Sequence, residues 1–219
     1  MTEPRILYLH GLASSPRSFK AEFFLPRLEA LGHRAVVPDL NKGDFFGLTT
    51  SRAVRLALGH LEAMDRPALV MGSSFGGRVA LHVAAQRPEL VSGLVLMAPA
   101  LCFGAVWDRI QTPEGLAAWR ETGALPMEHP AYDHPVALGY GFYLDALATD
   151  ALPSIPPELP ILLLHGRKDE VVPLGGSESF AASHPGARLV VLDSDHALND
   201  VTSEMWREIE PFASELLGP

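Results

Sequence analysis

The chain alternates between short continuous runs of apolar residues and segments in which apolar residues recur every three or four positions. The continuous runs predict strands covered on both faces, and the recurring positions predict amphipathic helices. This alternation is typical of an α/β protein, in which helical crossovers join parallel strands into one open sheet with helices on both faces. About six strands are predicted, at residues 6–9, 35–37, 69–72, 93–98, 161–164 and 188–192. The main helices are predicted at residues 16–31, 53–61, 75–86 and 201–217.

Two of these helices carry specific predictions about their ends and interior. Ser15 and Pro16 have the residue types preferred at an N-cap and at the first helical position, so they predict a helix that begins at Pro16. Pro211 lies inside the last helical segment. Because proline removes a backbone hydrogen bond and crowds the preceding turn, we expect a kink or break there.

The region from about residue 101 to residue 158 breaks the alternation and is rich in proline and aromatic residues. It is too long for a simple connection, so we predict a small cap inserted into a single domain of residues 1–219, with short helices at 114–122 and 141–148. Four aromatic residues of the cap are candidates to line a substrate pocket: Phe103, Trp107, Phe142 and Tyr143. The alternative is that these side chains only pack the cap onto the sheet.

The sequence Gly-Ser-Ser-Phe-Gly at residues 72–76 joins the third predicted strand to a helix. This Gly-x-Ser-x-Gly pattern is typical of a tight turn that lifts a serine hydroxyl above the edge of a sheet. Such a turn needs small flanking residues. We therefore interpret Ser74 as a nucleophile. The alternative is a glycine-rich turn without chemistry, and the apolar strand before it and the helix after it favour the first interpretation.

A serine hydroxyl is a weak nucleophile at neutral pH, so it needs a base, and the base needs a partner that fixes its tautomer. In an open parallel sheet, functional groups gather in loops beyond the carboxyl ends of the strands. Asp169 and His196 each follow a predicted strand, and we predict that they act as acid and base for Ser74. Glu170 and Asp195 remain alternative acids in the same two loops.

The reaction also needs N–H donors for the oxygen that becomes negative. One donor is expected at Phe75, directly after the nucleophile, and the other in the loop after the first strand, at Leu12 or Ala13. His10 and His165 precede glycines at strand ends. For these two histidines we predict a structural role, in which they anchor loops by hydrogen bonds.

Three residues of the predicted cap are candidate metal ligands. His129, Asp133 and His134 carry side chains that could bind a metal ion, but their spacing fits no established zinc pattern. A serine nucleophile with a histidine base needs no metal. We therefore predict neither a metal nor any other cofactor.

Composition and charge narrow the function further. The net charge of -9 opposes binding to nucleic-acid phosphates. It also disfavours a polyanionic substrate, unless basic residues gather locally to offset it: Arg17, Lys20, Arg167 and Lys168.

The single cysteine, Cys102, excludes an internal disulfide and fits a reducing compartment. We predict that it is a small buried residue. No secretory signal or membrane span is evident, so we expect a cytoplasmic protein without a membrane partner, and the oligomeric state is left open.

Four motifs together resemble the α/β-hydrolase superfamily: residues 9–21, 72–76, 165–173 and 195–196. The first resembles the opening of small bacterial esterases and, more distantly, of palmitoyl-protein thioesterases. The order serine, aspartate, histidine along the chain is also that of this superfamily. The resemblance implies an α/β-hydrolase fold with Ser74, Asp169 and His196 as a catalytic triad, and with the backbone N–H groups of Leu12 and Phe75 as oxyanion donors.

We therefore expect a serine hydrolase that cleaves a small-molecule carboxylic ester or thioester, with a small to medium acyl group, through an acyl-enzyme on Ser74. Within the same fold, the alternatives are C–C bond hydrolysis, acyl transfer and perhydrolysis. An alternative of another class is a ligand-binding protein that keeps the fold without catalysis.

Overall fold

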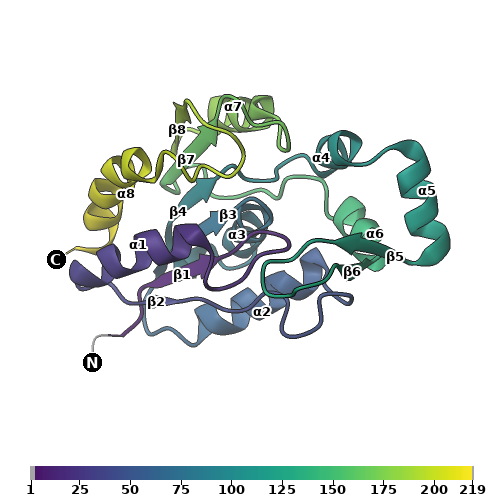
Figure 1. The fold of residues 1–219 in the computed structure, drawn as a ribbon. Coiled ribbons are helices and arrows are strands. Elements are labelled where there is room, and N and C mark those ends of the chain that lie inside the picture. Colours follow the sequence, from purple (N-terminus) through teal and green to yellow (C-terminus); the bar gives the residue numbers. More distant parts are fainter. Residues whose placement is uncertain (1–2, 219) are drawn as a thin grey trace.

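The computed structural model describes residues 3–218, and its centre is a six-stranded sheet (Figure 1). All neighbouring strands run parallel, in the order β2-β1-β3-β4-β7-β8. This confirms the predicted α/β class and the six-stranded parallel sheet. The strands are β1 (Ile6–Leu9), β2 (Ala35–Val36), β3 (Ala68–Ser73), β4 (Val91–Met97), β7 (Ile161–Gly166) and β8 (Ala187–Leu192).

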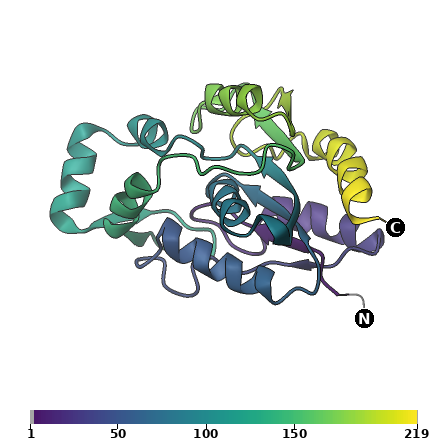
Figure 2. The same cartoon turned by 180° about the vertical axis from the view of Figure 1, so that it is seen from behind.

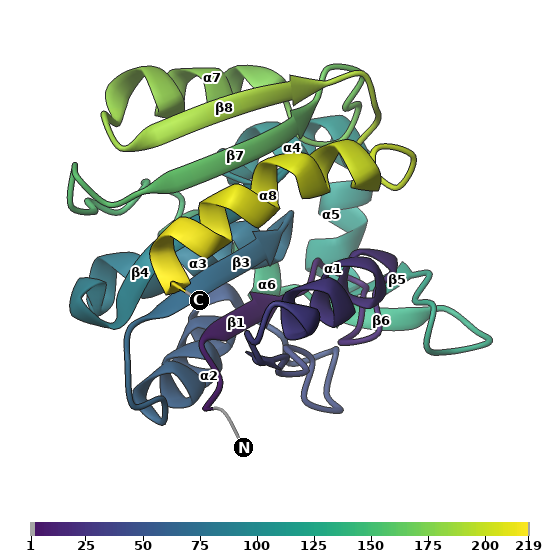
Figure 3. The same cartoon turned by 90° about the vertical axis from the view of Figure 1, so that its left-hand side faces the viewer.

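Helices cover both faces of the sheet, as Figure 3 shows with α1 and α8 in front of it. One face carries α1 (Phe19–Ala30) and α8 (Thr202–Leu217). The other carries α2 (Thr50–Glu62), α3 (Phe75–Gln86) and α7 (Leu174–Ser183), and a short 3₁₀ helix, η1 (Pro88–Leu90), leads into β4.

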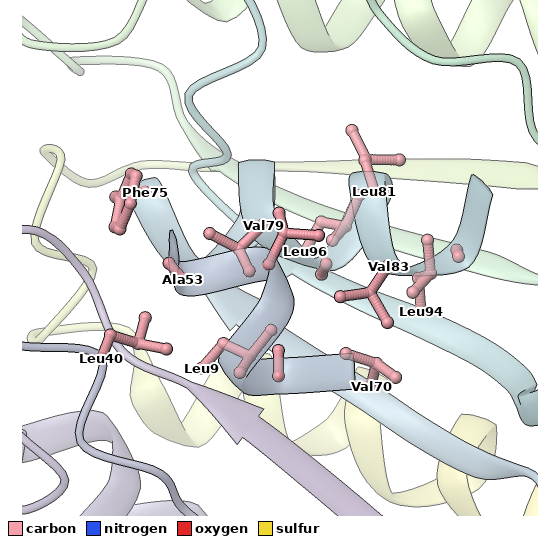
Figure 4. Packing of buried hydrophobic residues seen from close by; sticks show 14 of the residues in the cluster. Leu9, Leu40, Ala53, Val70, Phe75, Val79, Leu81, Val83, Leu94 and Leu96 are labelled. Atoms are coloured by element: carbon pink, nitrogen blue, oxygen red, sulfur yellow. The ribbon is translucent and has the colours of Figure 1, made fainter. Parts of the chain in front are cut away.

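Two separate hydrophobic cores follow from this layering. Successive side chains of a strand point to opposite faces. In β1, Ile6 and Tyr8 accordingly pack under α1 and α8, while Leu7 and Leu9 pack against α2 and α3. Burial on both sides explains why the strands read as continuous apolar runs. Figure 4 shows the second core, in which the following residues from the strands and from α3 meet: Leu9, Val70, Leu96, Val79 and Val83.

The predicted start of the first helix was wrong, and the break considered at Pro211 is absent. Helix α1 begins at Phe19 rather than Pro16, because Ser15 accepts a hydrogen bond from the Ser18 N–H in a preceding turn and Ser18 acts as the N-cap. Helix α8 is not broken at Pro211 but continues from Thr202 to Leu217. Buried residues on both sides of the proline, Ile209 and Ala213, pack into the same core and hold the two halves as one helix.

Residues 101–158, which we call the cap segment, lie between β4 and β7 and extend to the left in Figure 2. They form α4 (Phe103–Ile110), α5 (Pro113–Thr122), α6 (Gly141–Ala148) and an antiparallel pair of strands, β5 (Ala124–Met127) and β6 (Val136–Gly139). The helices predicted at 114–122 and 141–148 are present, whereas α4 and the strand pair were not predicted. Trp107 and Trp119 pack with ring centroids 4.9 Å apart, and the Trp119 indole N–H donates to the Leu138 carbonyl at 3.0 Å.

Cys102 is exposed, so its predicted burial was wrong. It occupies the N-cap position of α4, in the connection that leaves the sheet, and its neighbour Leu101 is the residue buried there. Within residues 3–218, no helix combines the length and apolar character needed to cross a lipid bilayer.

Candidate active site

Ser74 lies in a strained turn between β3 and α3, with φ at 52° and ψ at -113°. A residue other than glycine at such angles costs about 1–3 kcal/mol and persists only when its surroundings fix it. The Ser74 N–H donates to the Met97 carbonyl at 2.9 Å, which ties the turn to β4. A Cβ atom on Gly72 would approach the Gly76 carbonyl oxygen to 2.4 Å, and one on Gly76 would approach the Leu9 carbonyl oxygen to 2.1 Å. Both glycines are therefore required by close backbone packing.

Of the three residues predicted to act together, His196 lies within hydrogen-bond distance of both Ser74 and Asp169. His196 Nε2 is 3.0 Å from Ser74 Oγ, and His196 Nδ1 is 2.8 Å from Asp169 Oδ2. They come from the loops after β8, β3 and β7, all at the carboxyl edge of the sheet. With the proton on Nδ1 donated to Asp169, Nε2 is free to accept the serine proton.

Asp169 is buried and held by four groups. Its Oδ1 accepts from the N–H groups of Val171 and Val172 at 2.9 and 2.7 Å, and its Oδ2 also lies 3.2 Å from His165 Nε2. Burial alone would raise the pKa of Asp169, but hydrogen bonds from His165, His196 and Val172 hold this pKa well below its usual value. The carboxylate therefore stays ionised at neutral pH.

The two alternative acids are placed differently. Glu170 is exposed, and among residues 3–218 the His196 ring has hydrogen-bond partners only in Ser74 and Asp169. Asp195 Oδ1 instead accepts from the N–H groups of Ala197 and Leu198 at 2.9 and 3.3 Å. These hydrogen bonds stabilise the conformation of the loop that carries His196, which we call the histidine loop.

His10 and His165 have the structural contacts predicted for them. His10 Nε2 accepts from the Leu40 N–H at 3.0 Å, and burial lowers its pKa, which favours the neutral ring. His165 Nδ1 lies 2.8 Å from Ser177 Oγ and so ties the end of β7 to α7. The contact of His165 with Asp169 was not foreseen, although its place four residues before the acid was the available signal.

The N–H groups predicted to bind the oxyanion are free. Within residues 3–218, the amides of Leu12 and Phe75 have no hydrogen-bond acceptor, and both residues line the same cavity as Ser74 and His196. Ala13 does not line this cavity. The arrangement therefore favours Leu12 over Ala13 as the second donor.

An apolar cavity of about 430 Å³ opens beside Ser74, which we call the acyl cavity. Of the four aromatic residues singled out in the cap, Phe103, Trp107 and Phe142 line it, but Tyr143 does not. Phe142 and Tyr143 are consecutive on α6 and point about 100° apart, so only one of them faces the cavity. Tyr143 instead stacks on Tyr140, with ring centroids 5.5 Å apart. Most of the remaining wall is apolar: Ala100, Val106, Ile110, Leu125, Pro126, Met127 and Val171. Arg78 and Gln111 also line the cavity.

The three candidate metal ligands of the cap segment, His129, Asp133 and His134, do not form a metal-binding cluster. His129 is buried, with its ring nitrogens facing the Asn41 amide and the Ala131 N–H, whereas Asp133 and His134 are exposed. In the part of the chain that the structure describes, no three His, Cys, Asp or Glu side chains are grouped to hold a metal ion.

Lys20 on α1 supports the histidine loop, a contact that sequence reasoning missed. Its Nζ donates to the Ala197 carbonyl at 2.6 Å, directly after His196. The lysine lies in the motif at residues 9–21, but nothing in the sequence indicated its partner 177 positions away.

Replacing Lys20 with methionine is expected to lower kcat on a neutral ester about tenfold, because a small displacement of the base costs rate more than substrate binding. KM should change less than kcat. Lys20→Arg keeps a donor and should recover most of the rate. Lys42→Met, at an exposed position away from this loop, is the matched control. Equal losses in Lys20→Met and Lys42→Met would contradict the positioning role.

Comparisons with known proteins agree with this fold. The mouse palmitoyl-protein thioesterase ABHD10, mitochondrial, is 29% identical over 181 residues, which are 78% of this chain, and the chain spans 60% of that protein's length. The pimeloyl-[acyl-carrier protein] methyl ester esterase of Aromatoleum aromaticum is 30% identical over 241 aligned positions, covering 88% of this chain and 90% of the relative.

A solved structure shows the same architecture over nearly the whole chain. Alpha/beta hydrolase domain-containing protein 10 from mouse superposes with a TM-score of 0.80 at 24% identity, covering 99% of this chain and 92% of that one. The predicted α/β-hydrolase fold and the resemblance to esterases and thioesterases are thereby confirmed. Residues 5–213 match the family described as "Uncharacterised protein family (UPF0227)". The chain therefore has the α/β-hydrolase fold and belongs to the uncharacterised protein family UPF0227.

Proposed function

We propose that this protein is a serine hydrolase that cleaves a carboxylic ester or thioester of a small to medium acyl group. The observation that carries the proposal is the hydrogen-bonded chain from Ser74 through His196 to Asp169, with distances of 3.0 and 2.8 Å. The names of the relatives, an esterase and a thioesterase, support the same class of reaction.

In the first half of the reaction, Ser74 Oγ attacks the carbonyl carbon while its proton passes to His196 Nε2. Asp169 stabilises the imidazolium that forms. The carbonyl oxygen becomes negative and accepts hydrogen bonds from the N–H groups of Phe75 and Leu12. When the tetrahedral intermediate collapses, the C–O or C–S bond breaks, and His196 gives its proton to the departing alcohol or thiol.

The second half releases the acyl group to water. His196 Nε2 takes a proton from a water molecule, whose oxygen attacks the acyl carbon on Ser74. Collapse of this second intermediate returns the proton to Ser74 Oγ and frees the carboxylic acid. The cycle consumes one water and needs no cofactor.

The acyl cavity supports a small to medium apolar acyl group. Its wall is mostly aliphatic and aromatic, and burying a methylene group there contributes about 0.8 kcal/mol. We therefore expect kcat/KM for p-nitrophenyl esters to rise roughly three- to fourfold per added methylene until the cavity is full, and then to level off. Steady-state rates across an acyl-length series measure this.

A variant that fills the cavity provides the control. Val106 lines its wall, and Val106→Phe should move the optimum to shorter acyl groups. The ratio of the rates on hexanoate and acetate esters should fall in this variant. A flat length series in the wild type, or an unchanged ratio in Val106→Phe, would contradict the assignment of this cavity to the acyl group.

A further inference from the structure

A second cavity, of about 560 Å³, is lined in part by residues close in sequence to those of the acyl cavity, and it differs from that cavity in chemistry. Its wall combines serine, asparagine, arginine and lysine side chains with the apolar residues Phe19, Pro130, Ala131 and Ala197. No acidic residue lines it, although the whole chain carries a net charge of -9. We call it the basic cavity; the lining residues used below are Ser14, Ser15, Arg17, Lys20, Ala197 and Asn199.

The basic cavity is continuous along the chain with the proposed reacting centre. Leu12 and His196 line the acyl cavity, while Ser14 and Ala197, two and one residues further on, line the basic cavity. The same two loops thus form part of both walls. A substrate whose acyl group fills the acyl cavity would have its leaving group directed past His196 toward the basic cavity.

The positive charges of this cavity are available to a ligand. The Arg17 side chain is exposed, and among residues 3–218 it has no hydrogen-bond or ion-pair partner. Lys20 is half-buried, and burial lowers its pKa to about 8, so it remains mostly protonated at pH 7. The nearby acid, Asp195, already accepts from Ala197 and Leu198.

Arg167 and Lys168, on the loop after β7, are less suited to an anion. Arg167 and Lys168 both lie close to Asp193, at 3.7 and 3.1 Å, and Asp169 and Glu170 line the hollow that they share. The four cations singled out in the sequence therefore do not form one patch. Of these four residues, Arg17 and Lys20 line a cavity without acids. Lys42, Arg52 and Arg55 line another such cavity, but none of its residues belongs to the loops that carry Leu12 and His196.

We propose that the basic cavity holds the leaving group of the substrate and that this leaving group is anionic, an alcohol or thiol that carries a phosphate, sulfonate or carboxylate. This inference rests on the proposed function, because it deepens the same site. It pairs an apolar acyl group with a negatively charged carrier. Such a substrate would be selected at both ends of its scissile bond.

Two pairs of butanoyl thioesters test the charge of the leaving group at two lengths. The short pair compares 2-mercaptoethanesulfonate with its neutral methyl sulfone, and the long pair compares phosphopantetheine with pantetheine. We expect kcat/KM to be about tenfold higher for the anionic member of at least one pair, and raised salt should reduce this preference. Arg17→Gln should lower the ratio of anionic to neutral rates about fivefold.

Arg55→Gln is the matched control, since it removes the same charge from an exposed position on α2 and should leave the ratio as in the wild type. A ratio near one in both pairs, or equal effects of Arg17→Gln and Arg55→Gln, would overturn the inference.

A binding measurement distinguishes failure of this inference from failure of the proposed function. Calorimetry measures phosphopantetheine and 2-mercaptoethanesulfonate binding to Ser74→Ala, and the ligand that binds more tightly should bind several-fold more weakly when Arg17→Gln is added. If no ester or thioester is turned over, the proposed function fails. The calorimetry still tests whether the basic cavity binds an anion. Absence of binding of both ligands would then overturn the inference as well.

Discussion

Replacing Ser74 with alanine is expected to lower kcat/KM for p-nitrophenyl butanoate by about 10⁴-fold or more. Without the hydroxyl no acyl-enzyme forms, and only the N–H groups at Leu12 and Phe75 and the acyl cavity remain to assist direct attack by water. Initial rates of the variant and the wild type at the same enzyme concentration measure the loss. The fraction of active enzyme is determined on the wild type.

The neighbouring serine offers a matched control. Ser73 is buried at the end of β3, one residue before the turn, and Ser73→Ala removes the same atom. We expect it to retain activity within about tenfold of the wild type. Both variants should show cooperative thermal unfolding. A folded Ser74→Ala protein with turnover close to that of Ser73→Ala would remove Ser74 from the mechanism.

Changing Asp169 to asparagine is expected to lower kcat by about 10²- to 10⁴-fold. The asparagine oxygen can still accept from the N–H groups of Val171 and Val172, which leaves the amide nitrogen facing His196 Nδ1. Nδ1 would then act as an acceptor, and the ring proton would move to Nε2. In that tautomer Nε2 cannot take the proton of Ser74, so the base is lost while the geometry is kept.

Asp195→Asn separates the two candidate acids. Because Asp195 accepts two backbone N–H groups of the histidine loop, we expect its replacement to lower kcat by less than about tenfold. Rates of both variants on one ester, measured over a range of pH, provide the comparison. A larger loss in Asp195→Asn than in Asp169→Asn would reassign the acid.

The sheet could be predicted because its strands obey a simple rule. Burial on both faces makes each of the central strands β1, β3, β4 and β7 a continuous apolar run, and helices between such runs force parallel pairing. The carboxyl ends of parallel strands lie at one edge, so Ser74, Asp169 and His196 could be expected to meet although they are far apart in sequence.

The cap segment was less predictable because its structure depends on contacts rather than on periodicity. Helix α4 begins at Phe103 without a side-chain N-cap hydrogen bond, and the strands β5 and β6 pair across a loop rich in proline. The direction of Tyr143 depends on the orientation of α6 about its axis, which is set by packing. Sequence alone could identify aromatic residues there but not which of them face the cavity.

The contacts by which other elements stabilise the site could not be predicted from the sequence either. Lys20 contacts the Ala197 carbonyl. Every residue type has a backbone carbonyl, so the sequence does not show which one accepts the hydrogen bond. His165 could be interpreted as a loop anchor, yet its second contact, with Asp169, depends on how the loop after β7 folds back. Such supports need the three-dimensional arrangement.

The most direct test of the central claim is to label the wild-type protein with a fluorophosphonate and to map the adduct by peptide mass spectrometry. The account predicts one phosphonylated serine per chain, at Ser74, formed rapidly in the wild type and at least about a hundredfold more slowly in His196→Ala. A folded protein that stays unlabelled, or an adduct on another residue, would contradict it.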